Sequence, residues 1–381
     1  MKRVLITGGA GFIGSNLARA LNARGYAVTV LDVLSPQVHG ASPFTSPLVR
    51  SLEGVARLVH GSVTDKALMS LELTEADVIV HLAAETGTGQ SMYNVHSYSD
   101  VNIGGTTLML DILGSVPHLV KRMVVASSRS IYGEGRYRDD EGRYVYPKQR
   151  RMVDCENGLF DPINPRTGTA YELCATDEDS KIHPSSVYGI TKQVQEQMVM
   201  TVAPLLGIEP VALRYQNVYG PGQSLANPYT GILSIFSNLI LQKKEINVFE
   251  DGLESRDFVF ISDVVAATIL AIEHDNAPGE VFNVGSGVPT TVLEVVDRLR
   301  RHLGTDGGYR VSGEFRIGDI RHNYADLTRI SDRLGYLAQV PFEVGIERFA
   351  VWVADQGPEN SAYERSLAEM RQRGLMKRGS A

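Results

Sequence analysis

Tyr188 and Lys192 are the pair of residues whose types and spacing point most directly to chemistry. They stand four residues apart in a stretch with helical character, and positions i and i+4 share one helix face. Tyrosine with its free pKa of about 10 is a poor base, but a neighbouring lysine cation stabilises the phenolate and lowers that pKa. The same spacing is common on ordinary surface helices. The pair therefore indicates a proton-transfer centre only in combination with further motifs.

A serine-rich turn at residues 127–133 follows a run of buried strand character at 123–126. In open α/β sheets, ligands bind beyond the carboxyl ends of the strands. Ser128 is therefore expected to hydrogen-bond a substrate hydroxyl or a developing alkoxide, and Ser130 is a second candidate. The alternative is a serine that only caps the turn.

Glycines at positions 8, 11 and 14 lie between a strand expected at 4–7 and a helix expected at 13–24. Gly8 permits a tight turn, Gly11 lets a pyrophosphate approach the backbone, and Gly14 allows close packing of helix and strand. The free N–H groups and positive dipole end of the helix would then face the phosphates. Because strand, turn and helix occur in the required order, the motif predicts a dinucleotide site.

Asp32 ends the second predicted strand. A carboxylate there can accept hydrogen bonds from both adenosine ribose hydroxyls and would repel a 2′-phosphate, which favours NAD over NADP. No arginine or lysine occurs at 33–38 to bind such a phosphate. The alternative is a solvated aspartate at the end of a strand.

Short β-branched runs alternate with helical patterns through the first third of the chain, which predicts βαβ units and a parallel sheet. The fold class expected is α/β, a Rossmann-type doubly wound sheet with a smaller C-terminal α/β substrate domain. The strands expected first are residues 4–7, 28–31, 77–82 and 123–126.

Two stretches interrupt this pattern. Residues 134–184 form a long, polar and weakly periodic stretch. We therefore expect either a flap that covers the substrate or a small subdomain, rather than an inert surface addition. They hold both cysteines, whose spacing does not resemble a metal knuckle, so we expect no metal site. Residues 358–381 form a tail in which 363–373 is expected to be helical, followed by a loose basic tip.

The 381-residue chain carries a formal net charge of −7, which argues against general affinity for nucleic acid or anionic membranes. Its apolar N-terminal run is too short for a signal peptide, and no stretch approaches the roughly 20 apolar residues that cross a bilayer. Cys155 and Cys174 do not form a disulfide framework. Together these features favour the cytoplasm.

A series of motifs in one order gives the chain a resemblance to a known family. They are Gly8-x-x-Gly11-x-x-Gly14, Asp32, His81-Leu82-Ala83-Ala84, Asn102, Ser128, Tyr188-x-x-x-Lys192, Tyr215-Gln216-Asn217-Val218-Tyr219-Gly220-Pro221, Arg256-Asp257-Phe258-Val259 and Gly318-Asp319. From about residue 1 to 355 the sequence resembles the extended short-chain dehydrogenase/reductases, the nucleotide-sugar epimerase and dehydratase family.

The resemblance implies that NAD is the cofactor and that a nucleotide-diphosphate sugar is the substrate. Tyr188 would take a proton from a sugar hydroxyl, Lys192 would hold the cofactor ribose, and Ser128, with Ser130 beside it, would share the proton path. The residues implied to bind the cofactor are Gly8, Gly11, Phe12, Ile13, Gly14, Asp32, Ser62, Val63, Leu82, Ala83, Ala84, Asn102, Tyr188, Lys192, Tyr215, Asn217 and Val218. Those implied to bind the substrate are Glu85, Ser128, Arg129, Asn217, Arg256 and Arg316, with Arg321 as a further candidate.

Positions 129 and 130 discriminate between reactions within the family. Similar 4,6-dehydratases carry Asp-Glu where Arg129 and Ser130 stand, decarboxylases carry a glutamate at the second position, and GDP-fucose-forming enzymes a cysteine. What remains is oxidation and re-reduction at C4, that is 4-epimerisation. Several segments, including 87–93 and 227–231, also resemble dTDP-L-rhamnose 4-epimerase-like proteins. Glu85 stands where an apolar residue is expected beside the sugar, so the identity of the sugar stays undecided.

Three further expectations concern organisation and rival functions. The dinucleotide domain would comprise 1–212 and about 255–272, and the substrate domain 213–254 and 273–357. The resemblance implies a homodimer formed through helices near 103–114 and 189–204. The rival functions are a nucleotide-sugar dehydratase or dehydrogenase of the same fold, and a non-catalytic sensor of the cofactor.

Overall fold

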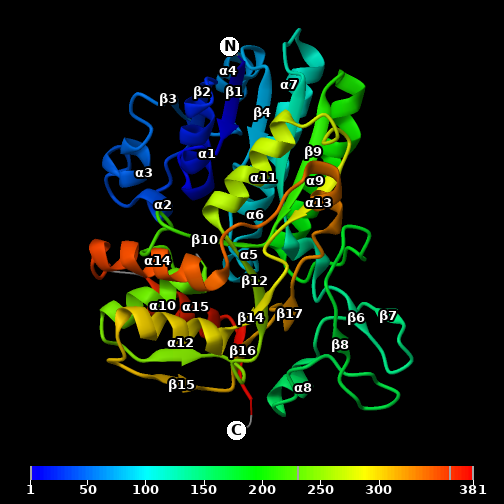
Figure 1. Cartoon of the computed structure of the whole chain (residues 1–381), viewed down its shortest axis with the longest axis vertical. Coiled ribbons are helices and arrows are strands. Elements are labelled where there is room, and N and C mark those ends of the chain that lie inside the picture. Colours follow the sequence, from blue (N-terminus) through cyan, green and yellow to red (C-terminus); the bar gives the residue numbers. More distant parts are fainter. Residues whose placement is uncertain (1, 230, 360–361, 380–381) are drawn as a thin grey trace.

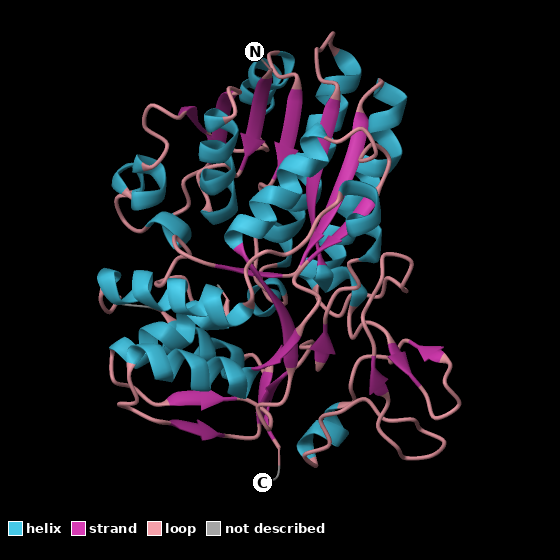
Figure 2. Cartoon of the chain, in the orientation of Figure 1, coloured by secondary structure: helices cyan, strands magenta, loops and turns pink. Residues whose placement is uncertain are grey.

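The computed structural model describes residues 2–229, 231–359 and 362–379, which fold around a parallel sheet. Within these ranges the sheet has seven strands, all paired in parallel, visible in the upper half of Figure 2. Their spatial order is β13 (Val281–Val284), β9 (Glu209–Tyr215), β5 (Arg122–Ser128), β4 (Val78–His81), β1 (Arg3–Thr7), β2 (Ala27–Asp32) and β3 (Ala56–His60). The predicted doubly wound sheet and its first strands are confirmed, with small differences at the strand ends.

Helices cover both faces of this sheet (Figure 1). Ile6 of β1 packs in one core with α1 (Phe12–Ala23) and α11 (Ile261–Glu273). Leu5, the next residue along, packs on the opposite face, where the helices are α4 (Lys66–Thr74), α7 (Gly105–Ser115) and α9 (Val187–Val202). Because both faces are buried, the strands are apolar without alternation.

A second, smaller sheet with its own helices lies beyond the carboxyl ends of the main strands, and we call this part of the molecule the second layer. Strand β12 (Ser255–Phe260) pairs with β10 (Asn217–Tyr219), β14 (Pro289–Thr291) and β17 (His322–Asn323). Its helices are α10 (Ile232–Leu241), α12 (Val292–Leu303) and α14 (Phe342–Gln356), which lie below the main sheet in Figure 1.

Two boundaries differ from the expected division of the chain. Strand β13 belongs to the main sheet although residues 273–357 were assigned to the substrate domain. Strand β12 belongs to the second sheet, whereas α11, directly after it, packs on the main one. A buried apolar run indicates a strand but does not say which sheet it joins.

Residues 134–184 form a small subdomain at the lower right of Figure 1. Its elements are β6 (Tyr137–Arg138), β7 (Tyr144–Val145), β8 (Glu172–Leu173) and α8 (Met152–Glu156), with β6 between its two antiparallel neighbours. Buried charge anchors it to the second layer: Arg150 pairs with Glu250 at 2.8 Å, and Arg321 with Asp161 at 2.7 Å.

The C-terminal tail packs against the second layer. The predicted helix is confirmed as α15 (Tyr363–Gln372), but the loose tip is wrong, because β18 (Met376–Arg378) pairs antiparallel with β16 (Glu314–Arg316). The parts of the tail at 360–361 and 380–381 lie outside the described residues, as does Thr230 within the 227–231 segment.

The shorter elements complete the chain. They are α2 (Pro36–His39), η1 (Pro43–Thr45), α3 (Pro47–Arg50), α5 (Thr88–Ser91), α6 (Val95–Tyr98), η2 (Ser99–Gly104), η3 (Arg129–Tyr132), η4 (Ala203–Leu206), β11 (Ile246–Val248), β15 (Tyr309–Val311) and α13 (Thr328–Leu334). None of the helices in the described ranges combines the length and apolar character that crossing a membrane requires.

Candidate functional site

The glycine turn after β1 has the geometry that its sequence predicts. Gly8 has φ +68°, and a Cβ there would lie 2.7 Å from the backbone nitrogen of Ala83. A Cβ on Gly14 would lie 2.4 Å from Cα of Gly9, so helix and turn are in direct contact. Helix α1 begins at Phe12, and no side chain caps its N-terminus. Its first amides and positive dipole end can therefore bind an anion.

Asp32 ties the end of β2 to this turn. One carboxylate oxygen accepts from the backbone N–H of Ala10 at 3.0 Å and the other from that of Leu34 at 2.8 Å. Each carboxylate oxygen offers about two acceptor positions, so one on each remains for a ribose hydroxyl.

The other predicted cofactor residues gather at the same edge of the sheet. Leu82 extends β4 by donating its N–H to the carbonyl of Thr7 at 3.0 Å, and Ala83 and Ala84 follow. Ser62 and Val63 follow β3. Asn102 fixes the loop after β4 from both sides: its side chain accepts from the N–H of Glu85 at 2.7 Å and donates to its carbonyl at 3.1 Å.

Tyr188 lies in the first turn of α9 and lines a cavity between the two layers. Its ring meets that of Tyr98 edge to face, with 6.4 Å between centroids. Burial raises the pKa of Tyr188, while a hydrogen bond with Ser128 and the charge of Arg129 oppose that rise. The Ser128 hydroxyl therefore acts on the Tyr188 phenol, and their shared role in proton transfer stays a prediction.

Ser130 donates two hydrogen bonds to Ser128. Its backbone N–H and its hydroxyl both donate to the Ser128 oxygen, at 3.1 and 2.9 Å. Since that oxygen accepts twice, the Ser128 hydroxyl still has its own proton to donate. Ser130 thus holds the oxygen of Ser128 in place.

Lys192 differs from expectation in its partner. Its ammonium donates to the side-chain oxygen of Gln195 at 2.5 Å, and burial lowers its pKa to about 7 despite the opposing charge of Glu196. The pKa of Tyr188 is raised, not lowered as the lysine alone would make it, because burial outweighs the favourable contacts. The four-residue spacing predicts that Tyr188 and Lys192 share a helix face, but it does not predict that both side chains are removed from water.

The cavity beside Tyr188 has a volume of about 270 Å³. Its polar lining comes from Arg129, Asn217, Asn247, Glu250, Glu254, Arg256, Arg316 and Asp319. Its apolar lining includes Ile232, Ile235, Phe236, Phe249 and Ile320. This combination of an apolar body with a few convergent charges suits a small polar ligand.

Three guanidinium groups share this cavity. Arg129 donates from Nε to the side-chain oxygen of Asn217 at 2.8 Å. Arg256 donates to the carbonyls of Ser255, Arg321 and Ile320, at 2.8, 2.8 and 2.7 Å. Burial and the charge of Arg256 lower the pKa of Arg129 to about 9. Guanidinium groups can hold a diphosphate through charge-assisted hydrogen bonds, although Glu250, Glu254 and Asp319 line the same cavity.

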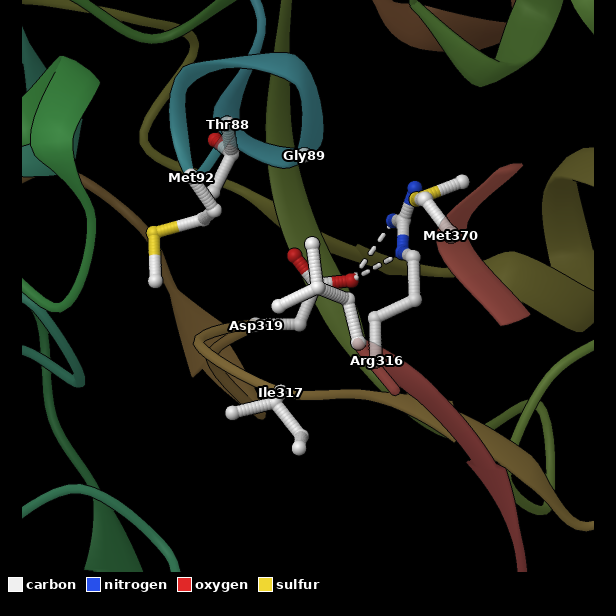
Figure 3. Close-up of a pocket in the computed structure, with 8 residues that line it drawn as sticks. Thr88, Gly89, Met92, Arg316, Ile317, Asp319 and Met370 are labelled. Carbon is white, nitrogen blue, oxygen red and sulfur yellow. Dashed lines mark hydrogen bonds and ion pairs between the residues drawn. The ribbon is translucent and has the colours of Figure 1, made fainter. Parts of the chain in front are cut away.

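The third guanidinium belongs to Arg316, which forms an ion pair with Asp319 (Figure 3). Although burial alone would raise it, the charges of Arg316 and Arg256 lower the pKa of Asp319. Figure 3 shows a second, smaller pocket that shares Arg316, Asp319 and Met370 with the cavity beside Tyr188. Met370 of α15 lies next to the ion pair there, and Thr88 and Met92 lie on the other side of this smaller pocket.

Several predicted residues do not reach the cavity. Arg321 is 1% exposed and is held by Asp161, Glu250 and Asp251. Tyr215 directs its hydroxyl into the core, to Thr268 at 2.8 Å.

Glu85 is also outside the cavity lining, and burial raises the pKa of its carboxyl. No described residue of 134–184 lines the cavity, so the interpretation of this segment as a flap over the substrate is not supported.

Sequence reasoning missed the wall that α15 contributes to the cavity. Tyr363, Ser366 and Met370 line it and are each less than a tenth exposed. Their spacing of three and four residues is that of one helix face, so the buried face could have been predicted, although not its neighbour. Glu254 was also missed, and burial raises the pKa of its carboxyl to about 8.

Metal ligation has no support in the part of the chain that the structure describes, where no group of three or more His, Cys, Asp or Glu side chains could hold an ion. Cys155 packs between Phe160 and Phe315, as expected for a small apolar filler.

Comparisons with known proteins agree with this geometry. The chain is 37% identical to dTDP-L-rhamnose 4-epimerase of Burkholderia thailandensis, over 93% of this chain and 96% of that protein. The crystal structure of UDP-glucose 4-epimerase from Thermotoga maritima with UDP-glucose aligns with a TM-score of 0.74 at 28% identity, over 93% of this chain and 99% of that one. UDP-glucuronic acid 4-epimerase from Bacillus cereus, in complex with UDP-glucuronic acid and NAD, aligns with a TM-score of 0.76 at 25% identity and the same coverage. The profile of the NAD dependent epimerase/dehydratase family matches residues 4–152 and 156–285. The chain belongs to this NAD dependent epimerase/dehydratase family.

Proposed function

We propose that the protein is an NAD-dependent 4-epimerase of a nucleotide-diphosphate sugar. The observation that carries this proposal is the position of Tyr188 in the wall of a cavity that three guanidinium groups also line, with Ser128 as a hydrogen-bonding partner of the phenol. A proton acceptor at one end and a diphosphate cradle at the other are the two features that such a substrate requires.

The residues after β1 fit the dinucleotide. A side chain at Gly8 would fill the space against Ala83, α1 offers uncapped amides, and Asp32 keeps acceptor positions for a ribose. When bound, NAD would accept a hydride and later return it, and would add a positive charge to the site. That charge favours the phenolate and opposes the effect of burial on the pKa of Tyr188.

The chain's own residues then carry the proton and hold the substrate. Tyr188 would accept the proton of the C4 hydroxyl as that carbon is oxidised, and Ser128 would donate to the sugar oxygen or to the phenolate. After the keto-sugar has turned, Tyr188 would return the proton as C4 is reduced from its opposite face. Arg129, Arg256 and Arg316 hold the diphosphate throughout. The cycle is redox-neutral.

The positions that distinguish related reactions favour epimerisation. Arg129 and Ser130 stand where the dehydratases carry Asp and Glu, so this position offers no carboxyl group as the acid or base that dehydration needs. Arg129 is instead hydrogen-bonded to Asn217, and Ser130 to Ser128. The substrate of the Burkholderia thailandensis relative makes a dTDP-deoxyhexose the first compound to test. We also propose a cytoplasmic homodimer formed through α7 and α9, on the grounds of the family resemblance and the free cysteines.

The test is incubation of the purified protein with dTDP-, UDP-, GDP- and CDP-hexoses and deoxyhexoses, without added cofactor. Inversion at C4, followed by NMR, supports the proposal. A keto-sugar product identifies a dehydratase and net NADH a dehydrogenase. Tight binding of NAD and sugar nucleotide without turnover identifies a sensor, and each of these three outcomes overturns the proposal.

A further inference from the structure

Lys192 is held inside the protein by a partner on its own helix. Its ammonium donates to Gln195, one turn further along α9, and the two side chains are 2% and 0% exposed. An ammonium has only donors, so the atom of Gln195 that faces it is the carbonyl oxygen. The orientation of this amide is thereby fixed, and its nitrogen points the other way.

The amide nitrogen of Gln195 fixes the protonation of a buried histidine. It lies 2.8 Å from Nε2 of His81, at the end of β4, and 2.9 Å from the hydroxyl of Thr106. Thr106 donates its proton to the carbonyl of Asn102 at 2.6 Å and can therefore accept from Gln195. Nε2 of His81 also lies 3.0 Å from the Thr106 hydroxyl, to which a protonated Nε2 could donate. The amide nitrogen of Gln195 is closer, at 2.8 Å, and can only donate, so we infer that Nε2 carries no proton.

The proton of the His81 imidazole therefore resides on Nδ1, which lies 2.6 Å from the hydroxyl of Thr7. His81 is fully buried, and burial together with the charge of Lys192 lowers its pKa to about 3. The ring is neutral at any pH at which the protein works. The hydrogen bonds thus run without a gap from Lys192 to the last residue of β1, directly before the glycine turn.

We propose that Gln195 and His81 are positioning residues for Lys192: the Nδ1–H tautomer of His81 orients the Gln195 amide, whose carbonyl oxygen holds the lysine ammonium. This role rests on the proposed function, in which Lys192 works as a cation. Gln195 touches neither the reacting atoms nor the cavity, and acts only through Lys192.

The carbonyl oxygen favours the charged form of Lys192, whereas burial disfavours it. The ionisable groups on α9 and on the elements and loops around it are mostly buried or half-buried: Tyr188, Glu196, His81, Glu85, Tyr98, Arg122, Arg129, Tyr132, Arg214 and Tyr215. His96, Asp100, Asp111 and Glu209 are exposed. Glu196 is paired with Arg214 at 2.7 Å, which reduces its influence on the lysine. The neutral amide of Gln195 is therefore a main support of the ammonium.

The first experiment does not depend on turnover. Heteronuclear NMR of the purified protein, labelled at histidine, reports which nitrogen of His81 is protonated, and His81→Asn identifies the signal. We expect Nδ1 protonated and Nε2 bare between about pH 5 and pH 9, with the Nε2 signal displaced in Gln195→Leu. A proton on Nε2, or identical His81 signals in wild type and Gln195→Leu, would overturn the proposal.

The second experiment is the pH profile of epimerisation by the NAD-loaded enzyme. The ammonium is present below the pKa of Lys192 and lost above it. Loss of the carbonyl in Gln195→Leu lowers that pKa, so the alkaline limb should move down by about one pH unit. Gln195→Glu, which is nearly isosteric and serves if the leucine variant does not fold, should move it up. The control is Gln356→Leu, at an exposed position at the end of α14 and away from the proposed dimer helices.

A lower kcat with an unmoved alkaline limb in both Gln195 variants would indicate a merely structural role and sink the proposal. If wild type epimerises no sugar, the proposed function fails while the NMR result still decides the tautomer.

Discussion

Arg129 and Asn217 are 88 positions apart in the chain, yet the arginine Nε donates to the asparagine oxygen at 2.8 Å. The bond joins the end of β5 to β10 and fixes one guanidinium of the proposed diphosphate cradle. Asn217→Ala removes the acceptor, and because hydrogen bonds to charged groups contribute about 1.5–3 kcal/mol, KM should rise at least tenfold. Asn217→Asp keeps an acceptor and should lose less. Steady-state kinetics decides, and equal KM values in wild type and Asn217→Ala would contradict the assignment.

Tyr188→Phe removes the proposed proton acceptor while keeping the ring that packs on Tyr98. General acid–base catalysis contributes about 10²–10⁴-fold, so kcat should fall by that factor. Binding of the sugar nucleotide, measured by calorimetry, should be unchanged. The exposed Tyr144→Phe is the matched control. A variant that retains most of its kcat would remove Tyr188 from the chemistry.

Glu254 predicts an alkaline limit to substrate binding. Its carboxyl lines the cavity, and burial raises its pKa to about 8. Below that value the group is neutral, and above it the carboxylate repels the substrate diphosphate. KM should therefore rise as the pH passes about 8. Glu254→Gln is neutral at every pH and should abolish the rise, whereas Glu347→Gln, at an exposed position of α14, should keep it.

Met370 is predicted to be a specificity residue of the α15 wall, since it is 4% exposed and lines the cavity. Met370→Ala shortens the wall and should raise KM about tenfold while lowering unfolding free energy by about 2–5 kcal/mol. Met370→Leu, which conserves volume, should cost less than about 1.5 kcal/mol and keep KM. Met152→Ala, at a 44% exposed position, controls for the substitution itself. An unchanged KM in Met370→Ala would show that α15 does not touch the ligand.

Substitution of two glycines with positive φ distinguishes the cost of backbone strain from the cost of a steric clash. Gly8 (φ +68°) faces the backbone of Ala83, whereas Gly25 (φ +85°) has open space around its Cβ position. Gly25→Ala should lower unfolding free energy by about 1 kcal/mol for the left-handed backbone alone. Gly8→Ala should lower it further, by several kcal/mol, and weaken NAD binding. Chemical denaturation and fluorescence titration measure both, and equal losses would exclude the contact with Ala83.

Much of the sheet and the grouping of the proposed catalytic residues could be predicted because the signals are local. The glycines around Gly11 occupy a single turn, and Tyr188 and Lys192 share one helix face, so spacing alone brings these groups together. Ser128 was predictable because it ends a buried strand.

The rest depends on contacts between distant segments. The pairing of β18 with β16 involves three residues on each strand, too few for a periodic signal. Arg321 can be buried because carboxylates at 161, 250 and 251 compensate its charge. The pKa of Tyr188 is raised because the packing of both layers buries it. Desolvation is a property of the assembled fold, which residue spacing does not encode.

The pairing of β18 with β16 has a consequence for biosynthesis. Proteins emerge from the ribosome N-terminus first, so the sheet with its glycine turn can assemble while residues 363–378 are still in the exit tunnel. The wall of the cavity is finished only after those residues are released. A nascent chain should therefore retain dinucleotide before it can retain a sugar nucleotide, and affinity tags are better fused to the N-terminus than beside β18.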